Sequence, residues 1–448
     1  MTTDTVGTGT PTTGPMCMAG TVTCNGTIAQ MCGSDGFPDM TMPCAVTCID
    51  GLGCADCTPD SLRCNAGNVE SCNEQGEWVV SSICNQDQGI VCDNQLKTCS
   101  GDCLPEKLLQ EGHTHIGCEF FAASSSVNTP NNESLAIFVS NPGDQTAVVR
   151  AGQTPWLEVV IEIEPSSSKE IVLPWDTSIT SPKGKTVLSH SGAAHIQSTQ
   201  PVVITQHNPV WPSTGGDASL LIPVTSWGTH YVVASYSGFE VQPGIYYEGA
   251  YVIVGSADGT QIDLTPHKGA KIHPGAGLAA DGGGKLIINQ GDILQVLADG
   301  PSDLTGTLVK ADRPVQVFGV HRCAEVPSGV GNCEHLEEAM LPVSALGRTH
   351  VLVPPATAED PTLRREQIVR IVATKAGTSL TFNPVVAPMM TLSQVGDFTD
   401  IGPVAEPFVL ISSAPVLVAQ YMLGSAWDGS GFDPSMSIAV PVESFATS

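Results

Sequence analysis

The sequence predicts an all-β protein in which disulfide-rich N-terminal modules precede tandem β-sandwich-like units. Only 14% of the 448 residues are charged, while the chain contains 46 glycines and 33 prolines. This composition is typical of strands joined by turns. The cysteines are distributed unevenly, because fourteen of the sixteen lie between Cys17 and Cys118. A β-propeller-like arrangement is the alternative for the later strands, but propeller blades are usually only about 40–50 residues long.

The overall charge and hydrophobicity narrow the class of partner. A formal net charge of −27 disfavours nucleic acid and anionic membrane surfaces, which are bound by clustered basic side chains. A hydrophobic content of 41% is sufficient for packed cores. No run of apolar residues is long enough to span a bilayer, so we expect no transmembrane segment.

The N-terminal segment 1–16 reads MTTDTVGTGTPTTGPM and has neither a basic stretch nor an apolar stretch. It therefore lacks the features of a signal peptide, and we expect a flexible Thr/Gly linker with no export signal in this sequence. The dense cysteines that follow nevertheless indicate an oxidising compartment. We expect an extracellular or bacterial cell-surface location.

The cysteine-rich segment is a duplication with the template C-x6-C-x7-C-x11-C, shifted by 40 residues. Each copy adds two further cysteines, so the repeats, 17–56 and 57–103, each have a set of six that can form three internal bridges, and Cys103 at the end of the second repeat lies outside these sets. We expect the bridges to close within each copy, while the connectivity inside a copy stays open among fifteen possibilities. The two sets are Cys17, Cys24, Cys32, Cys44, Cys48 and Cys54, and Cys57, Cys64, Cys72, Cys84, Cys92 and Cys99.

Structural disulfides explain these cysteines better than a metal or redox site does. Forty residues bury too little surface to offset their ordering entropy, and a bridge contributes about 2–4 kcal/mol. Cys54 and Cys57 form a C-x2-C at the repeat junction, but no second C-x2-C completes a zinc site. No strand–helix context for a thioredoxin-like motif is apparent around this pair.

From about residue 113 the chain contains three β units, 104–220, 221–340 and 341–448, which share landmarks in a fixed order. The spacing of roughly 100–115 residues, with about seven strands each, is that of a β-sandwich domain. We expect the second and third units to superpose strand for strand, with their Pro-Val strands in the same sheet position. The landmarks are the Thr-His pairs at 114, 229 and 349, the hairpins 135-LAIFVSNPGDQTAVVR, 251-YVIVGSADGTQIDLTP and 369-VRIVATKAGTSLTFNP, and the strands 201-PVVITQH, 314-PVQVFGVH and 415-PVLVAQY.

A fourth landmark joins the units and reads 222-IPVTSWGTH, 341-LPVSALGRTH and 440-VPVESFATS. The third copy predicts a truncated fourth unit beginning at the end of the sequence. The helical pattern around Glu334 to Met340 is short. Trp227 recurs as Leu346 and Phe445, so we expect it in the core; exposure of the other tryptophans is not predictable.

Four cysteines remain outside the repeats, and their separations favour the pairs Cys103–Cys118 and Cys323–Cys333. The segment between the second pair contains Pro327, Gly329 and Gly331, which suit a turn. We expect Cα separations of about 4.4–6.8 Å for both pairs. The second bridge would hold a loop between the Pro-Val strand and the next unit, where a binding loop could be kept rigid.

Five motifs follow one another along the β region: 117-GCEFFAASSSVN, 136-AIFVSNP, 216-GDASLLIPVTSWGTHYVV, 323-CAEVPSGVGNCEHLEEAMLPVSALG and 433-DPSMSIAVPVESF. Together they resemble the IgGFc-binding protein N-terminal domain family, over residues 105–448. The cysteine repeat resembles modules that precede such domains in secreted proteins of myxobacteria and their relatives. The resemblance implies an extracellular, non-enzymatic binding or matrix role and supplies no catalytic residues.

Acidic residues near the unit boundaries are weak candidates for calcium, because oxygen ligands at a junction would suit that ion. No complete calcium-binding loop is present, and a solvated acidic face explains the same residues. We otherwise expect no cofactor. The candidates are Asp217, Glu337, Glu338 and Asp433.

The histidines favour structural positions. His113 and His115 flank Thr114 in one of the recurring Thr-His landmarks, which favours a junction role over metal binding. His207 and His321 are read as equivalent ends of the Pro-Val strands, with Tyr421 in the third unit, so a polar-tipped ring explains them better than a catalytic imidazole does.

We expect a non-catalytic adhesion or recognition protein whose partners are extracellular glycans or surface proteins. Searches for a G-x-S-x-G elbow, an H-E-x-x-H helix and a P-loop find none. In Ser189-His190-Ser191 the neighbouring side chains point apart on a strand or loop. The alternatives are a secreted hydrolase whose site has no sequence signature and a purely structural spacer.

Overall fold

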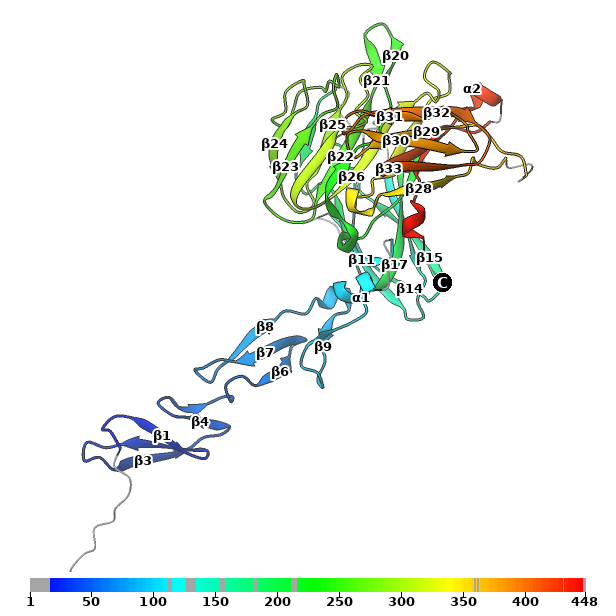
Figure 1. Ribbon diagram of the computed structural model, residues 1–448. Coiled ribbons are helices and arrows are strands. Elements are labelled where there is room, and N and C mark those ends of the chain that lie inside the picture. Colours follow the sequence, from blue (N-terminus) through cyan, green and yellow to red (C-terminus); the bar gives the residue numbers. More distant parts are fainter. Residues whose placement is uncertain are drawn as a thin grey trace, which may run out of the picture. The chain divides into compact units, whose positions relative to one another are not determined.

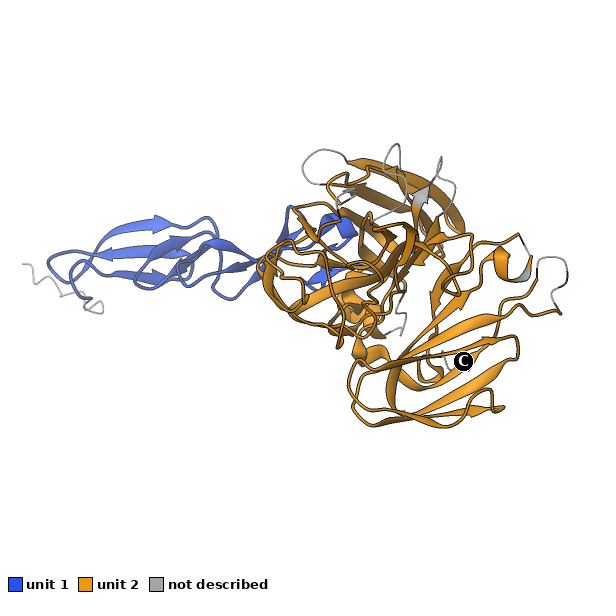
Figure 2. Cartoon of the chain, turned by 90° about the horizontal axis from the view of Figure 1, so that it is seen from above, with its two compact units in different colours: residues 1–101 blue, residues 102–448 orange. Residues whose placement is uncertain are grey.

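The computed structural model describes residues 17–110, 115–125, 134–153, 158–179, 184–210, 216–357, 360, 362–429 and 431–445. The chain divides into two compact units, Met1–Gly101 and Asp102–Ser448, which Figure 2 colours separately. Segment 1–16, the expected linker, lies outside the described residues. Cys103, assigned to the second cysteine repeat from the sequence, belongs to the second unit.

The first unit contains two copies of a three-stranded antiparallel sheet, and the strands of the second copy begin 40 residues after those of the first. Each copy continues into a small two-stranded sheet. The strands are β1 (Val22–Asn25), β2 (Ile28–Cys32), β3 (Pro38–Pro43), β4 (Thr47–Ile49) and β5 (Gly53–Ala55), then β6 (Leu62–Asn65), β7 (Asn68–Cys72), β8 (Trp78–Ser82), β9 (Val91–Cys92) and β10 (Cys99–Ser100).

Six disulfides hold the first unit together, and every one closes within its own copy, as the sequence predicts. Both copies join the first cysteine to the third, the second to the fifth and the fourth to the sixth. The pairs are Cys17–Cys32, Cys24–Cys48 and Cys44–Cys54, then Cys57–Cys72, Cys64–Cys92 and Cys84–Cys99.

The second unit is all-β and repeats one seven-stranded arrangement three times (Figure 1). The first β unit consists of β11 (Gly117–Ala122), β12 (Ser134–Asn141), β13 (Ala147–Gly152), β14 (Val159–Ile163), β15 (Ser167–Leu173), β17 (Ala194–Val210) and β18 (Asp217–Leu220). The second consists of β19 (Gly228–Val232), β22 (Gly249–Gly255), β23 (Thr260–Thr265), β24 (Gly284–Ile288), β25 (Ile293–Leu297), β26 (Leu308–Ala324) and β27 (Glu334–Ala339). The third consists of β28 (Gly347–Leu352), β29 (Gln367–Ala373), β30 (Thr378–Asn383), β31 (Met390–Leu392), β32 (Phe398–Val404), β33 (Phe408–Met422) and β34 (Ser435–Ile438).

The strand orders β14-β13-β17-β12-β15, β24-β23-β26-β22-β25 and β31-β30-β33-β29-β32 are the same. The Pro-Val strands β26 and β33 therefore have the same place in the strand orders of their two sheets. This confirms the predicted correspondence of the second and third β units. Residues 334–339 form strand β27, so the short helix that the pattern there indicated is not formed. Strand β16 (Val187–Ser189) lies within the sequence range of the first β unit but pairs with β25 of the second β unit. The predicted boundary at residue 220 therefore does not separate the two sheets.

Each β unit is built around one long strand whose first and second parts pair with different strands, and the unit is sandwich-like rather than a propeller blade. The first part of β17 pairs with β11 and β13, and its second part pairs with β12 and β18. Pro201, Pro314 and Pro415 lie where β17, β26 and β33 pass from one set of partners to the other. Proline has no N–H to give to a ladder, so it suits this bend.

The first strand of each β unit (β11, β19 and β28), which we call the opening strand, is marked by a glycine rather than by the Thr-His pair. Gly117, Gly228 and Gly347 each lie opposite the valine of the Pro-Val strand, and the next paired residues are Glu119, His230 and Thr349. The Thr-His pairs are thus out of register with one another. A proline recurs in the segment after the last strand of each β unit, as Pro223, Pro342 and Pro441. A Cβ added to each of the three glycines would lie only 2.3–2.4 Å from the Cβ of one of these prolines, so only glycine fits there.

The registers also correct the assignment of His321. His207, Val320 and Tyr421 are the equivalent residues, because they lie opposite Ala136, Ala250 and Ile368. His321 is one residue further along β26, so its side chain points to the opposite face of the strand.

The hydrophobic cores run across the boundaries between β units. All residues of β22 and of β29 are buried, although period-two alternation would bury one face only. One apolar cluster joins the first and second units, and another joins the second and third. The units therefore form one continuous body within Asp102–Ser448.

Candidate functional site

The closing strands β18, β27 and β34 of the three β units meet, and they bring buried carboxylates together. Asp217 Oδ2 accepts the N–H of Glu337 at 3.1 Å and the N–H of Met436 at 3.2 Å. Burial raises the pKa of Asp217 to about 6, of Glu334 to about 7 and of Glu338 to about 8. This cluster connects all three units.

Three of the four calcium candidates lie in this cluster, whereas Asp433 is exposed. The oxygens of Glu337 already accept hydrogen bonds from Ser125, Gln206 and Asn208, including Ser125 Oγ at 2.8 Å. Among the residues that the structure describes, no group of three or more His, Cys, Asp or Glu side chains is arranged to hold a metal ion. The carboxylates instead act as hydrogen-bond acceptors between units.

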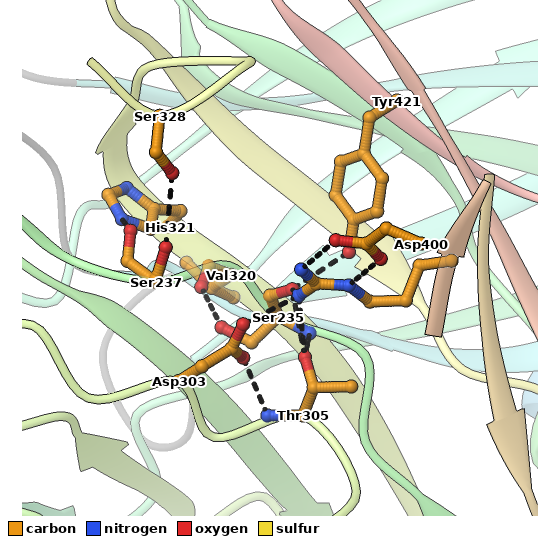
Figure 3. A network of polar contacts seen from close by, with 10 residues as sticks. Ser235, Ser237, Asp303, Thr305, Val320, His321, Ser328, Asp400 and Tyr421 are labelled. Atoms are coloured by element: carbon orange, nitrogen blue, oxygen red, sulfur yellow. Dashed lines mark hydrogen bonds and ion pairs between the residues drawn. The ribbon is translucent and has the colours of Figure 1, made fainter. Parts of the chain in front are cut away.

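A second polar network, centred on Arg370 of β29, joins the second and third β units. Figure 3 labels its partners Asp303, Asp400 and Ser235. The guanidinium is 4% exposed and donates to Asp303 at 2.7 Å, and to both carboxylate oxygens of Asp400 at 2.8 Å. It also donates to the carbonyl of Ser235 at 2.7 Å. Burial disfavours its charge, but the two carboxylates outweigh that cost and hold the pKa of Arg370 above its ordinary value.

His321 lies beside this network and supports the loop that follows β26 (Figure 3). Its Nδ1 accepts the N–H of Cys323 at 3.1 Å, and its Nε2 lies 3.2 Å from the carbonyl of Ser237, to which it donates. Burial lowers the pKa of His321 to about 3, so the ring is neutral at physiological pH. Ser237 Oγ in turn lies 3.2 Å from Ser328 Oγ in the loop.

This loop, residues 323–333, is closed by the predicted Cys323–Cys333 disulfide, whose Cα atoms are 5.1 Å apart. The other predicted pair, Cys103–Cys118, is also present, with a Cα separation of 5.7 Å. The corresponding loop of the third unit contains α2 (Ser425–Asp428). Gly424 donates its N–H to Val326 O at 2.9 Å, and Asn332 Nδ2 donates to Ser425 Oγ at 2.8 Å. Loops from two β units are therefore fastened to each other.

Trp427 lies on this joined loop surface, with 43% of the residue exposed. Its indole Nε1 donates to Glu366 Oε2 at 2.7 Å, which fixes the ring while leaving part of it accessible. Arg365, the residue before Glu366, donates from Nη2 to Leu423 O at 2.9 Å, and its guanidinium lies 5.0 Å from the centroid of the Phe432 ring. We call residues 323–333 with 424–434, excluding 430, the joined loops.

The remaining tryptophans are less available, where the structure describes them. Trp227 is 7% exposed, which confirms its predicted core position, and Trp175 is partly buried. Trp78 lies in the cysteine-rich unit, under the guanidinium of Arg63 at 4.3 Å. Trp156 and Trp211, like His113 and Thr114, lie outside the described residues.

A hairpin of the second unit, β20 (Phe239–Gln242) and β21 (Ile245–Tyr247), projects beyond the sheets (Figure 1). Its base is fixed by Tyr247, which packs edge-on against Phe239 and lies under Arg322 at 5.1 Å. Ile245 near its tip is 52% exposed. The hairpin is an insertion between β19 and β22 and is not one of the seven repeated strands.

Two other features have simpler explanations. His190 Nδ1 lies 3.1 Å from Asp292 Oδ2, and the N–H of Ser191 donates to the same carboxylate, so residues 190–191 are tied to the second β unit.

A groove of about 430 Å³ lies over β23 and β24. Lys285 in its wall is paired with Asp263 at 3.3 Å, so these two charges offset each other.

Fold and site together define an all-β protein of tandem sandwich-like units, with disulfide-rich modules and a surface of joined loops. The family model described as IgGFc binding protein matches residues 217–448, and the chain belongs to this family. The human IgGFc-binding protein is 26% identical over 231 residues, which are 51% of this chain and 4% of that protein. No solved structure matches the chain.

The match begins at β18 and contains the whole of the second and third β units. The first β unit lies almost entirely outside it, yet has the same strand order. Within the described residues, no helix is both long and apolar enough to cross a membrane.

Proposed function

We propose that this chain is an extracellular recognition protein that binds a protein partner, without catalysis, through the joined loops. The observation that carries this proposal is the fastening of two loops, by a disulfide and by hydrogen bonds, around the partly exposed ring of Trp427. Binding surfaces are commonly loops held on a rigid scaffold, and tryptophan is enriched among the residues that dominate binding energy.

Other features support the extracellular location and the class of partner. All sixteen cysteines are paired in disulfides, which persist in oxidising compartments. The human relative is named for binding the Fc part of immunoglobulin G, so an immunoglobulin-type β-sandwich is the first partner to test. Glycans are the second class, because an exposed indole ring also stacks on sugar rings.

The experiment is a binding screen of the whole chain against IgG Fc, a panel of secreted proteins and a glycan array. Trp427→Ala should weaken binding of the ligand found by about tenfold or more, as for a residue at the centre of an interface. Val385→Ala is the matched control, because Val385 is 82% exposed in the same β unit outside the joined loops. It should bind as the wild type does.

Replacing Cys323 and Cys333 by serine should also weaken binding, because the joined loops then lose their covalent closure. Equal affinity of the wild type, the Trp427 variant and the double-serine variant would show that the ligand binds elsewhere. Absence of any protein or glycan ligand would contradict a recognition role. Turnover in a panel of hydrolase substrates would contradict the non-catalytic assignment.

A further inference from the structure

The first cysteine-rich copy exposes three methionines on its three-stranded sheet. Met31 lies on the central strand β2, and Met40 and Met42 lie on the edge strand β3. Their exposed fractions are 49%, 64% and 54%, although methionine is among the residues most often buried in proteins. We call these three residues the methionine cluster. Core packing does not explain them, because about half of each side chain is in water.

The strand register places the three side chains on one face of the sheet. Met31 is paired directly with Met40, and Met42 is paired with Ala29, which lies two residues before Met31. Residues two apart on a strand share a face, so all three methionines project from the same side. Paired residues have Cβ atoms about 4.5–5.5 Å apart, and diagonal neighbours about 7–8 Å apart are still within reach of long side chains. Because a methionine side chain is unbranched and flexible, the three sulfurs can converge on one point.

Disulfides hold the backbone beneath the methionine cluster. Met31 directly precedes the second cysteine of the Cys17–Cys32 bridge, and Met42 lies two residues before the first cysteine of the Cys44–Cys54 bridge. The two strands that carry the cluster are therefore each anchored close to a methionine. A ligand that gathers the three sulfurs has to order side chains only, which lowers the entropic cost of binding.

The second cysteine-rich copy shows that the module folds without these methionines. Its sheet has the same strand order, and its bridges have the same connectivity. The residues 40 positions after the methionine cluster are Ser71, Val80 and Ser82. The cluster is therefore a property of the first copy, and its distinguishing chemistry is the presence of three thioether sulfurs.

The donors of the first copy determine which kind of ion it suits. Residues 17–56 contain four aspartates and no glutamate, histidine, lysine or arginine, so their formal charge of −4 attracts cations. All six cysteines of this copy are bonded in disulfides, so no thiolate is present there. The thioethers are therefore its soft ligands, and thioethers select Cu(I) among the metals that proteins bind.

We propose that Met31, Met40 and Met42 bind one Cu(I) ion through their three thioether sulfurs. The ion arrives as Cu(I) and exchanges weaker ligands for three neutral sulfurs, so neither an electron nor a proton is transferred. The exposure of the cluster lets the ion enter directly from solvent. Ca²⁺ prefers oxygen ligands and Zn²⁺ prefers thiolate, imidazole and carboxylate ligands, so neither ion should compete for this site.

Silver(I) is the first probe, because it is a soft monovalent analogue of Cu(I) and needs no reductant that would attack the disulfides. It is added as the nitrate, in chloride-free buffer, to the whole chain labelled with carbon-13 in its methionine methyl groups. The three methyl resonances of the cluster should shift together and saturate at one equivalent of silver. The resonance of Met389, which is 75% exposed in the β region, should stay in place.

Competition with a chromogenic chelator measures Cu(I) itself, supplied as its acetonitrile complex in the absence of oxygen. The wild type should withdraw one Cu(I) per chain. Its affinity should be the same at pH 5 and pH 7, because thioethers bind no proton, whereas histidine or thiolate ligands would lose affinity in acid.

The decisive variant replaces all three methionines by leucine, which removes the sulfurs and keeps apolar side chains of similar volume. It should withdraw no Cu(I), and each single Met→Leu replacement should weaken binding by about tenfold or more, since one of three metal–sulfur bonds is lost. Met389→Leu is the matched control and should bind as the wild type does.

A second variant carries the residues of the other copy, Met31→Ser, Met40→Val and Met42→Ser, and should also lose the ion. Peptide mapping without reduction verifies the three bridges of the first copy in each variant.

A wild type that binds neither silver(I) nor Cu(I) would overturn the proposal. Unchanged binding by the triple leucine variant would do the same, and so would an equal response of the three resonances to Ca²⁺ or Zn²⁺. The methionine cluster lies in the cysteine-rich unit and the joined loops lie in the β region, so these outcomes do not depend on whether the proposed recognition function holds.

Discussion

The two compact units of the chain maintain their folds in different ways. In residues 17–101 the buried apolar residues other than cysteine are Ala29, Val69 and Ile90, while six disulfides lie in the same segment. Residues 102–448 contain three large apolar clusters and two disulfides. Crosslinks thus replace a core where the chain is too short to bury one. Burial replaces crosslinks where β units pack on each other.

The largest expected effect is that of reduction, which should separate the two units in stability. With the bridges reduced, residues 17–101 lose about 2–4 kcal/mol per bridge and should unfold. The β region should retain most of its folded structure, because its clusters do not depend on disulfides. Limited proteolysis with and without reductant, read by mass spectrometry, measures this. Cleavage spread equally over both units would contradict the comparison.

Within the β region, the next largest effect should come from Arg370. Arg370→Leu leaves Asp303 and Asp400 facing each other without a cation, so the free energy of unfolding should fall by about 3–5 kcal/mol. Arg150→Leu is the matched control, because Arg150 pairs with Glu158 at the surface and should lose less than about 1 kcal/mol. Denaturant titration compares them. Equal losses would show that the Arg370 network does not hold the units together.

A smaller loss of stability is expected at the contact between the opening strand β19 and the segment after β27 that contains Pro342. Gly228→Ala places a Cβ 2.4 Å from the Cβ of Pro342, which forces a shift and should cost about 1–3 kcal/mol. Gly331→Ala is the control, because nothing lies within 4 Å of its added Cβ. Thermal melts of both variants measure the difference. A Gly228 variant as stable as the control would remove the steric basis of the landmark.

The effect that is smallest at any one step of the measurement is a pH dependence at the meeting point of the closing strands, because it is spread over several pH units. The pKa of Glu338 is raised from 4.5 to about 8, so between these values the folded state holds a proton that the unfolded state releases. Its stabilising contribution is therefore present at acidic pH and is lost as pH rises toward 8, by at most about 1.4 kcal/mol per pH unit. Glu338→Gln should flatten this decline.

The comparison for this last test is the difference in melting temperature between variant and wild type at each pH. The contributions of other titrating groups, such as His321, are present in both proteins and cancel in this difference. The variant should gain on the wild type from pH 5 to pH 8. A difference that is constant over this range would show that Glu338 does not titrate there.

Patterns with a short period were readable from the sequence. The 40-residue cysteine template predicted bridges that close within each copy, and the alternation around Ile262 and Leu264 predicted a strand with one buried face. The order of landmarks predicted equivalent strands in the second and third units. Each of these depends on neighbours in sequence or on an exact repeat of spacing.

Features that depend on contact between units were not readable. Tyr251 to Val254 form an unbroken apolar run because both faces are covered, which the sequence pattern alone does not distinguish from other buried segments. The Thr-His pairs matched in letters but not in register, because Arg348 adds one residue after Gly347. The partners of Arg370, Asp303 and Asp400, were not predictable because they are distant in sequence. A cation inside an apolar strand was the available clue.

The overlapping order of the bridges also determines how the cysteine-rich unit responds to tension. In its first copy, a pull passes through Cys17–Cys32, along the chain from Cys32 to Cys24, through Cys24–Cys48, from Cys48 to Cys44, and through Cys44–Cys54. Only those two short stretches can straighten, about 40 Å of peptide instead of roughly 120 Å for the whole copy at ~3.4 Å per residue. While oxidised, the modules are therefore nearly inextensible, and a stretched molecule lengthens in its β units.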